Sequence, residues 1–329
     1  MTTFSPEFEH ILDKYKKHKL DTYKVLELLG TDYTFTDWGA DTTDKRYAAL
    51  LNCGTFLQFN KALHDGKAVY HLTGANFCRQ RICPMCQFRR SEKMFAETLR
   101  VVKHLEGDYR FLHLVLTIPN PQDGQELRQG IQILFKGFNT FLKYKTVRRA
   151  FKGALRCLEI SMNHENGSFH PHLHTLVAVQ PSYFNDSRVY LSFHNIRQLW
   201  TKAVKSAIAS LPFDASFART GHVLQVSIRA CKQYDYVGVA EVCKYCVKPL
   251  DLDSYDDEYN SKRMLLTLWH TLKGQRFVQR YGIIREAWKE LNGSTDTDEL
   301  YDTADETGQE VALTWDSATL TYRGNGYPK

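Results

Sequence analysis

The chain has 329 residues, of which 43% are hydrophobic and 13% aromatic, so it can bury a full core and is not a disordered protein. The net charge of +6 is unevenly spread, because the segment from Gly293 onward has 8 acidic and 2 basic residues and leaves 41 basic against 29 acidic residues before it. This basic excess favours a polyanionic partner such as a nucleic acid, whereas the lack of an apolar run of about 18 residues and of an N-terminal leader favours a cytoplasmic protein.

The predicted elements divide the chain into an N-terminal extension, a cysteine-rich module, a main domain and an acidic tail: residues 1–50, 51–105, 106–292 and 293–329. The extension holds one charged helix at Glu7–Tyr23. The module ends in a basic amphipathic helix at Arg89–Leu105, whose apolar residues recur at helical spacing. The tail has little packing potential, and we expect it to keep the protein soluble.

The module carries a cysteine cluster. Three cysteines follow a C-x4-C-x2-C pattern and a fourth lies upstream: Cys53, Cys78, Cys83 and Cys86. Four thiolates around one Zn²⁺ make a closed structural site, and disulfides are disfavoured in a reducing cytoplasm. We therefore predict structural zinc, with His64 or His71 as alternatives to Cys53 or Cys78. The other cysteines are interpreted as core residues, although one pair forms a rival C-x2-C motif: Cys157, Cys231, Cys243 and Cys246.

The main domain alternates between strand-like and helical patterns. Strands are expected at Phe111–Ile118, Leu155–Asn163, Phe169–Val179 and His222–Arg229. Helices are expected at Gln125–Tyr144, His194–Ile208, Tyr234–Pro249, Tyr259–Leu272 and Ile283–Leu291. This order predicts an α+β fold in which helices pack on one face of an antiparallel sheet.

The strand at Phe169–Val179 contains two histidines separated by one leucine, His172 and His174. Alternate residues of a strand face the same side, and neutral imidazole is the commonest metal ligand in proteins. His170 shares this face and is a further candidate, whereas His113 is interpreted as structural. Counting back from a turn near Asn166-Gly167 places Glu159 opposite His174 or Thr175, and an error of one residue would reverse its face.

The helix at Tyr234–Pro249 combines a buried stripe with a reactive face. Helical spacing places Glu241, Tyr245 and Lys248 together, opposite the apolar residues Val239, Val242, Cys243 and Cys246. A carboxylate, a phenol and an ammonium group thus share one patch. The alternative interpretation is an exposed, charged helix face along which a tyrosine lies.

Three motifs in this order resemble the replication initiators of small rolling-circle plasmids, within the HUH endonuclease superfamily. They are Phe111–Ile118, His172-Leu-His174 and the segment from Glu241 through Tyr245 to Lys248. The resemblance is to the group that pairs one catalytic tyrosine with a glutamate. It extends over roughly residues 50 to 292 and includes the cysteine cluster and the segment Arg276–Gly282. It implies a ferredoxin-like or RRM-like antiparallel sheet.

The resemblance also implies a metal site and a nucleophile. His172 and His174, with Glu159 as third ligand, would hold Mn²⁺ or Mg²⁺, a Lewis acid for the scissile phosphate. Tyr245 would attack phosphorus, expel a 3′-hydroxyl and remain joined to the 5′ end of the DNA. The bond energy is conserved in this phosphotyrosine, so the strand can be rejoined.

Further roles implied by the resemblance belong to the same helix. Lys248 or Lys244 would hold the phosphate or ease ionisation of the tyrosine. Glu241 would be the general base that activates water in the terminating step.

The expected partner is plasmid origin DNA, as a single-stranded or hairpin nick site, and the family implies a host helicase and a single-strand binding protein. Three other functions remain open from the residues alone. One is a non-catalytic, zinc-containing regulator that binds the origin. The others are an HUH transposase and an unrelated metallohydrolase that uses the two histidines.

Overall fold

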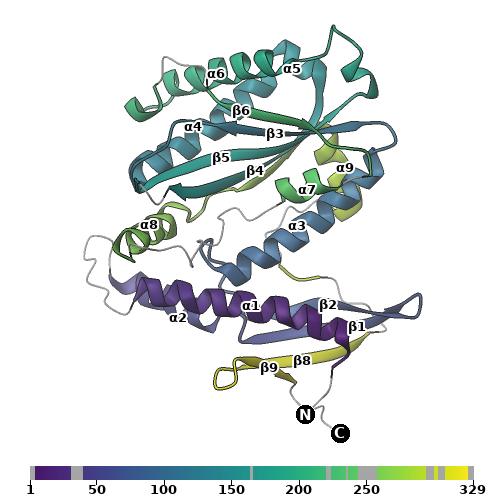
Figure 1. Cartoon of the computed structure of the whole chain (residues 1–329), viewed down its shortest axis with the longest axis vertical. Coiled ribbons are helices and arrows are strands. Elements are labelled where there is room, and N and C mark those ends of the chain that lie inside the picture. Colours follow the sequence, from purple (N-terminus) through teal and green to yellow (C-terminus); the bar gives the residue numbers. More distant parts are fainter. Residues whose placement is uncertain are drawn as a thin grey trace. The chain divides into compact units, whose positions relative to one another are not determined.

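The computed structural model describes residues 4–30, 40–163, 166–219, 224–234, 236–243, 258–293, 300–302 and 308–324, without the side chains of 40–44 and 258–260. By their own contacts these residues form two compact units (Figure 1). The first unit is Met1–Arg90 with Thr297–Lys329, and the second is Ser91–Asp296. Each contains one antiparallel sheet with helices, which confirms the predicted α+β class. None of the described helices has the length and apolar character that crossing a bilayer requires.

The first unit is built on a four-stranded sheet with the strand order β2-β1-β8-β9. Its strands are β1 (Phe56–His64), β2 (Lys67–Ala75), β8 (Gln309–Asp316) and β9 (Thr321–Gly324). The helices of this unit are α1 (Pro6–Leu29) and α2 (Ala40–Asn52), followed by the start of α3 (Pro84–Leu105). Helix α1 packs against the sheet through Phe8 and Tyr15, whose rings meet Phe59 edge-on at centroid distances of 5.2 and 5.6 Å. These aromatic contacts build the core of the unit.

The acidic tail is not poorly packed, contrary to our expectation. Strand β8 pairs antiparallel with β1 from Phe56↔Thr314 to Lys61↔Gln309. Its buried residues alternate along the strand: Val311, Leu313 and Trp315. This alternation is a strand signal, and the acidic residues of the tail concealed it. The tail therefore belongs to the unit that holds the cysteine module.

The second unit is built on a five-stranded antiparallel sheet with the order β6-β3-β5-β4-β7. Its strands are β3 (Arg110–Thr117), β4 (Phe151–Asn163), β5 (Ser168–Val179), β6 (Val226–Ala230) and β7 (Val278–Tyr281). Its helices, besides the remainder of α3, are α4 (Gly124–Lys143), α5 (Lys145–Ala150), α6 (Phe193–Ala209), α7 (Val237–Val242), α8 (Glu258–Thr271) and α9 (Gly282–Asn292). Short 3₁₀ helices occur at Pro181–Phe184 and Ser216–Ala218.

Helices cover both faces of this sheet, so the prediction that they pack on one face is wrong. On one face, the guanidinium of Arg156 from β4 lies 3.6 Å from the ring centroid of Phe135 in α4. Helix α6 packs on α4, and its Trp200 donates a hydrogen bond to the carbonyl of Thr117. On the other face, α3, α7 and α9 share a core cluster with inward residues of β4 and β5, including Leu155 and Leu176 (Figure 1).

The expected tyrosine helix is described only in part. Helix α7 spans Val237–Val242, which is the N-terminal part of the expected Tyr234–Pro249. Three residues of the predicted apolar stripe are buried in the core cluster, which confirms the stripe for this part: Val239, Val242 and Cys243. Lys244, Tyr245, Cys246 and Lys248 lie outside the described residues.

Candidate active site and metal centres

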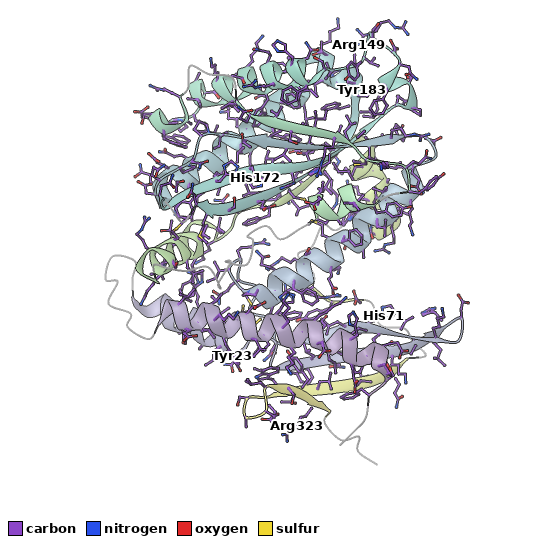
Figure 2. The ribbon with its side chains drawn as sticks, in the orientation of Figure 1. Tyr23, His71, Arg149, His172, Tyr183 and Arg323 are labelled. Carbon is purple, nitrogen blue, oxygen red and sulfur yellow. The ribbon has the colours of Figure 1, made fainter. Side chains whose placement is uncertain are left out.

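The β4–β5 hairpin brings three potential metal ligands together on the sheet face that α7 covers. Nε2 of His174 lies 2.9 Å from Oε2 of Glu159 and 3.2 Å from Nε2 of His172. Nε2 of His172 is 3.8 Å from the same carboxylate oxygen. We call Glu159, His172 and His174 the ligand trio; Figure 2 labels His172 on this sheet.

The register of the hairpin differs from our expectation, by two residues relative to His174 and by three relative to Thr175. Glu159 pairs with His172, and not with His174 or Thr175. The innermost pair is Asn163 with Ser168, so the turn is centred earlier in the chain than Asn166-Gly167. Because side chains alternate along a strand, a shift of two residues keeps the carboxylate on the histidine face, whereas a shift of one would have removed it.

The trio has the chemistry of a site for a divalent cation. Ligand atoms about 2.1 Å from an ion lie roughly 3.0 to 3.4 Å apart at octahedral or tetrahedral angles, and the observed separations bracket these values. Two imidazoles and a carboxylate are nitrogen and oxygen ligands that divalent metal ions accept. The chemistry of the donor set and its spacing therefore fit such an ion.

The protonation state of His172 also suits metal binding. Burial lowers the pKa of His172 to about 4, so the ring is neutral near pH 7. Its Nδ1 lies 3.0 Å from the carbonyl oxygen of His170. Because a carbonyl only accepts, Nδ1 carries the proton and donates it, which leaves the lone pair of Nε2 free on the side of Glu159.

The other two histidines considered from the sequence take different positions. His170 lies outside the trio, and its Nδ1 is 2.7 Å from Oδ1 of Asn120. His113 of β3 is buried, and its Nε2 lies 2.9 Å from Nδ1 of His174. On its other side, Nη2 of Arg229 donates to Nδ1 of His113 at 3.0 Å. Arg229 was not predicted from the sequence, whereas the alternation of β3 could have placed His113 on this face.

Helix α7 contacts β3 and β5 on the trio's face of the sheet. A Cβ at Gly238 would lie 2.5 Å from Sγ of Cys231, so glycine lets the helix approach the end of β6 this closely without a shift of either. At the end of the helix, Ser91 donates a hydrogen bond to the carbonyl of Cys243 at 2.6 Å. Glu241 is half-buried and lies away from the apolar stripe. The described segment thus ends at Cys243, two residues before Tyr245 in the sequence, on the trio's side of the sheet.

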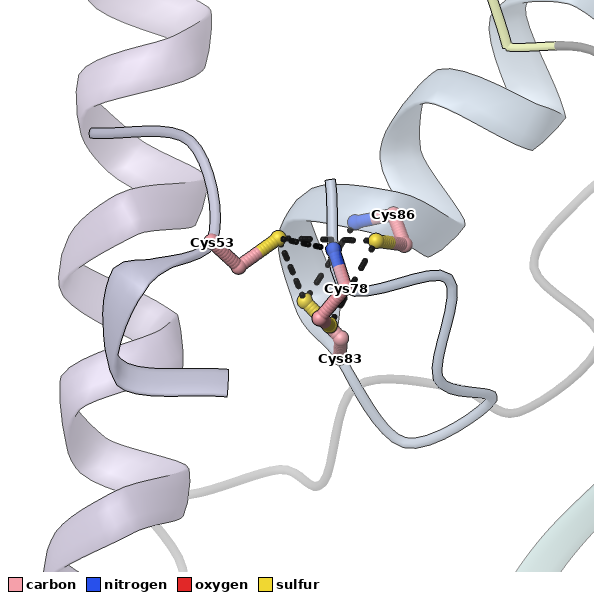
Figure 3. Close-up of side chains that lie close together, drawn as sticks. All are labelled: Cys53, Cys78, Cys83 and Cys86. Atoms are coloured by element: carbon pink, nitrogen blue, oxygen red, sulfur yellow. Dashed lines mark hydrogen bonds between the residues drawn. The ribbon is translucent and has the colours of Figure 1, made fainter. Parts of the chain in front are cut away.

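The four predicted zinc ligands converge in the first unit, and we call Cys53, Cys78, Cys83 and Cys86 the four-cysteine cluster (Figure 3). Sγ of Cys53 lies 3.5 Å from Sγ of both Cys83 and Cys86, and the Cys78–Cys86 distance is 3.7 Å. A tetrahedral site with Zn–S bonds of about 2.3 Å requires S–S separations of about 3.8 Å, whereas a disulfide requires about 2.05 Å. The separations therefore fit a tetrahedral metal site. Neither of the alternative ligands considered from the sequence, His64 and His71, is part of the cluster.

The surroundings of the four-cysteine cluster also favour a bound cation. Burial raises the pKa of Cys86 well above its usual value, so four neighbouring thiolates require a cation among them. Backbone amides of Cys78 and Arg79 donate to Sγ of Cys53 and Cys86 at 3.3 and 3.2 Å. Lys19 of α1 has no exposed surface, and its Nζ donates to the carbonyl of Cys53 at 2.8 Å. Lys19 was not predicted from the sequence, because nothing in the helix pattern links it to the cysteines.

Comparison with known proteins gives consistent matches. Residues 69–326 match the family model described as "Replication protein". The chain is 30% identical over 292 residues to "Protein rep" of Lactiplantibacillus plantarum, which covers 84% of this chain and 88% of that protein. It is 31% identical over 264 residues to "Protein rep" of a Bacillus species, covering 77% and 83%. It is 30% identical over 241 residues to "Replication protein" of Staphylococcus aureus, covering 70% and 96%. No solved structure matches significantly.

The matched proteins are replication proteins, and the α+β fold with its two candidate metal centres is consistent with that class. The family model covers well over half of the chain, and relatives of at least 30% identity cover most of it. The chain therefore belongs to the replication protein (Rep) family.

Proposed function

We propose that this Rep protein initiates and terminates rolling-circle replication of a plasmid by nicking one strand of the double-strand origin. The reaction is a transesterification that joins the 5′ end of the nicked strand to Tyr245. Family membership supports the role in plasmid replication. The observation that carries the nicking activity is the convergence of Glu159, His172 and His174 on the sheet face that α7 covers.

The trio would hold one Mn²⁺ or Mg²⁺, which when bound neutralises charge on the scissile phosphate and polarises its P–O bonds. His172 contributes through its fixed tautomer, because its Nδ1 is committed to the carbonyl of His170. Glu159 contributes a carboxylate. The residue is only 5% exposed, so water competes weakly with the metal for the carboxylate. These residues orient the phosphate and exclude water around it.

Tyr245 is the nucleophile in this proposal. Its phenol oxygen loses a proton and attacks phosphorus in line, the 3′-hydroxyl leaves, and the 5′ phosphate remains on the tyrosine. Lys244 or Lys248 holds the phosphate or favours ionisation of the phenol. Glu241, four residues before Tyr245 in the sequence, takes a proton from water in the closing step, so that hydrolysis ends replication without a new covalent adduct.

The four-cysteine cluster would hold a structural Zn²⁺. Its four thiolates leave no position for a substrate, and the site would tie the segment after β2 to the start of α3. The partners proposed from the family are origin DNA, a host helicase and a single-strand binding protein, in the bacterial cytoplasm.

The experiment that tests this function uses labelled single-stranded oligonucleotides that tile the replicon carrying the gene. The purified protein with Mn²⁺ is expected to form a covalent adduct with one of them, detected on denaturing gels, and Tyr245→Phe is expected to abolish it. Glu241→Gln should still nick but hydrolyse poorly. Adduct formation by Tyr245→Phe would refute the assignment. Tight origin binding without any adduct would favour the non-catalytic, zinc-containing regulator.

A further inference from the structure

Arg229 lies near the ligand trio, on the strand that forms one edge of the second sheet as described. It belongs to β6 and pairs directly with His113 of β3. Cross-strand partners share a face of the sheet, so its side chain lies on the trio's face. The side chain is exposed, and among the described residues no carboxylate forms an ion pair with it. Within the described part of the chain, Arg229 is thus a cation without a carboxylate partner, one strand away from the strand that carries His174.

Arg229, His113 and His174 form a continuous row of hydrogen-bonding groups. The Nη2 of Arg229 lies 3.0 Å from Nδ1 of His113, and Nε2 of His113 lies 2.9 Å from Nδ1 of His174. His113 is only 3% exposed, so water does not replace either contact easily. The protonation of each ring therefore depends on its neighbour in the row.

Metal ligation by His174 would fix which ring nitrogens in this row carry protons. A neutral imidazole has one N–H donor and one acceptor nitrogen, whereas a guanidinium has donors only. When Nε2 of His174 is a metal ligand, its proton is on Nδ1 and is donated to Nε2 of His113. The proton of His113 is then on Nδ1 and faces the N–H of Arg229. Two donors cannot form a hydrogen bond, so ligation through Nε2 of His174 leaves the row with only one of its two contacts. We expect the contact of Arg229 to break, because its side chain is exposed whereas His113 is buried.

We propose that Arg229 is a phosphate-binding residue that metal binding at the trio releases from His113 to the DNA backbone. His113 is the positioning residue that couples the two: it orients His174 and holds Arg229 only while His174 is not ligated. The released guanidinium is exposed, charged and on the trio's face, and it binds a phosphate of the nicked strand next to the scissile one. This inference rests on the proposed nicking function for the identity of the substrate.

The first test compares DNA binding with and without metal. All variants carry Tyr245→Phe, so that no cleavage occurs, and the probe is a fluorescent single-stranded oligonucleotide measured by anisotropy. In Mn²⁺, Arg229→Gln is expected to weaken binding about five-fold or more and to lower the slope of log K against log salt by about 0.7, the loss of one phosphate contact on a single strand. In buffer without Mn²⁺ the same substitution is expected to change affinity by less than about two-fold.

The matched control is Arg188→Gln, which removes an exposed arginine that pairs with Asp186 away from the trio. It is expected to leave binding unchanged in both conditions. An equal loss of affinity for Arg229→Gln with and without Mn²⁺ would overturn the coupling. No loss in either condition would overturn the phosphate contact itself.

The second test measures the affinity for Mn²⁺ by electron paramagnetic resonance, without DNA. Arg229→Gln is expected to bind Mn²⁺ a few-fold more tightly, because the competing contact to His113 is weakened. Simple charge repulsion predicts the same direction, so the measurement is repeated in a His113→Leu background. Under the proposal the effect of Arg229→Gln disappears there; its persistence would overturn the role of His113. Neither readout depends on cleavage, so a failure of the nicking assay and a failure of this coupling are distinguishable.

Discussion

The two candidate metal centres differ in how they are built. The four-cysteine cluster offers like ligands at separations that fit a closed tetrahedron, with backbone amides donating to the sulfurs. The ligand trio offers three mixed ligands on a sheet face, with a histidine and an arginine beside them. Four protein ligands leave a metal with no position for a substrate, whereas three leave positions open. The comparison predicts a stabilising role for the first site and a chemical role for the second.

The largest effect is expected from breaking the four-cysteine cluster. Cys83→Ser replaces a fully buried sulfur of the cluster, so the first unit should lose more than about 4 kcal/mol of stability and its zinc. Zinc content and thermal unfolding measure this outcome. Cys157→Ser changes a buried cysteine outside the cluster and is the control for zinc content, which it should not alter. A zinc-free variant with unchanged unfolding would contradict the structural role.

Removing a ligand of the trio should lower activity strongly and stability only slightly. His172→Ala is expected to lower the rate of adduct formation roughly 10³-fold, because a ligand next to the scissile phosphate is lost, while the free energy of unfolding changes by less than about 2 kcal/mol. The measurements are single-turnover adduct formation and chemical denaturation. His170→Ala, in the same strand but outside the trio, should retain most of the activity. Equal activity of the two variants would remove the trio from the mechanism.

A smaller effect is expected from removing the buried ammonium group beside the four-cysteine cluster. Lys19→Met keeps most of the side-chain volume but removes the buried ammonium that contacts the carbonyls of Leu51 and Cys53. We expect the affinity for Zn²⁺ to fall about 10- to 100-fold, the usual effect of removing a group that supports metal ligands. Competition with a chromogenic chelator measures it. Lys14→Met on the same helix is the control, and an equal loss there would argue against a specific contribution from Lys19.

The smallest effect concerns the placement of α7. Gly238→Ala would bring a Cβ to 2.5 Å from Sγ of Cys231, so the helix has to shift, at a cost of about 1 kcal/mol or more. Adduct formation is expected to slow several-fold through displacement of Glu241 and Tyr245. Adding Cys231→Ala removes the clashing sulfur and should restore the rate. No recovery in the double variant would mean that the close approach at Gly238 does not position the helix.

The parts of the site that depend on strand alternation or helical spacing could be predicted from the sequence. The alternation of His172 and His174 placed two imidazoles on one face, and the spacing of Val239, Val242 and Cys243 placed their helix on the core. Strand β7 and the hairpin β1–β2 were missed, although they contribute to the two sheets. Their short or mixed patterns do not separate strand from loop, and pairing partners far along the chain decide their state.

By itself, the sequence determined the α+β class, the imidazole pair, the cysteine cluster and the apolar stripe of α7, because each depends on residues close together in the chain. The tertiary structure alone decided that Glu159 pairs with His172, that Lys19 lies against the cysteines and that Arg229 reaches His113. It also decided that the acidic tail completes the first sheet. These features depend on strand register and on contacts between distant segments. Both are determined by shape and burial, and only when the whole chain packs.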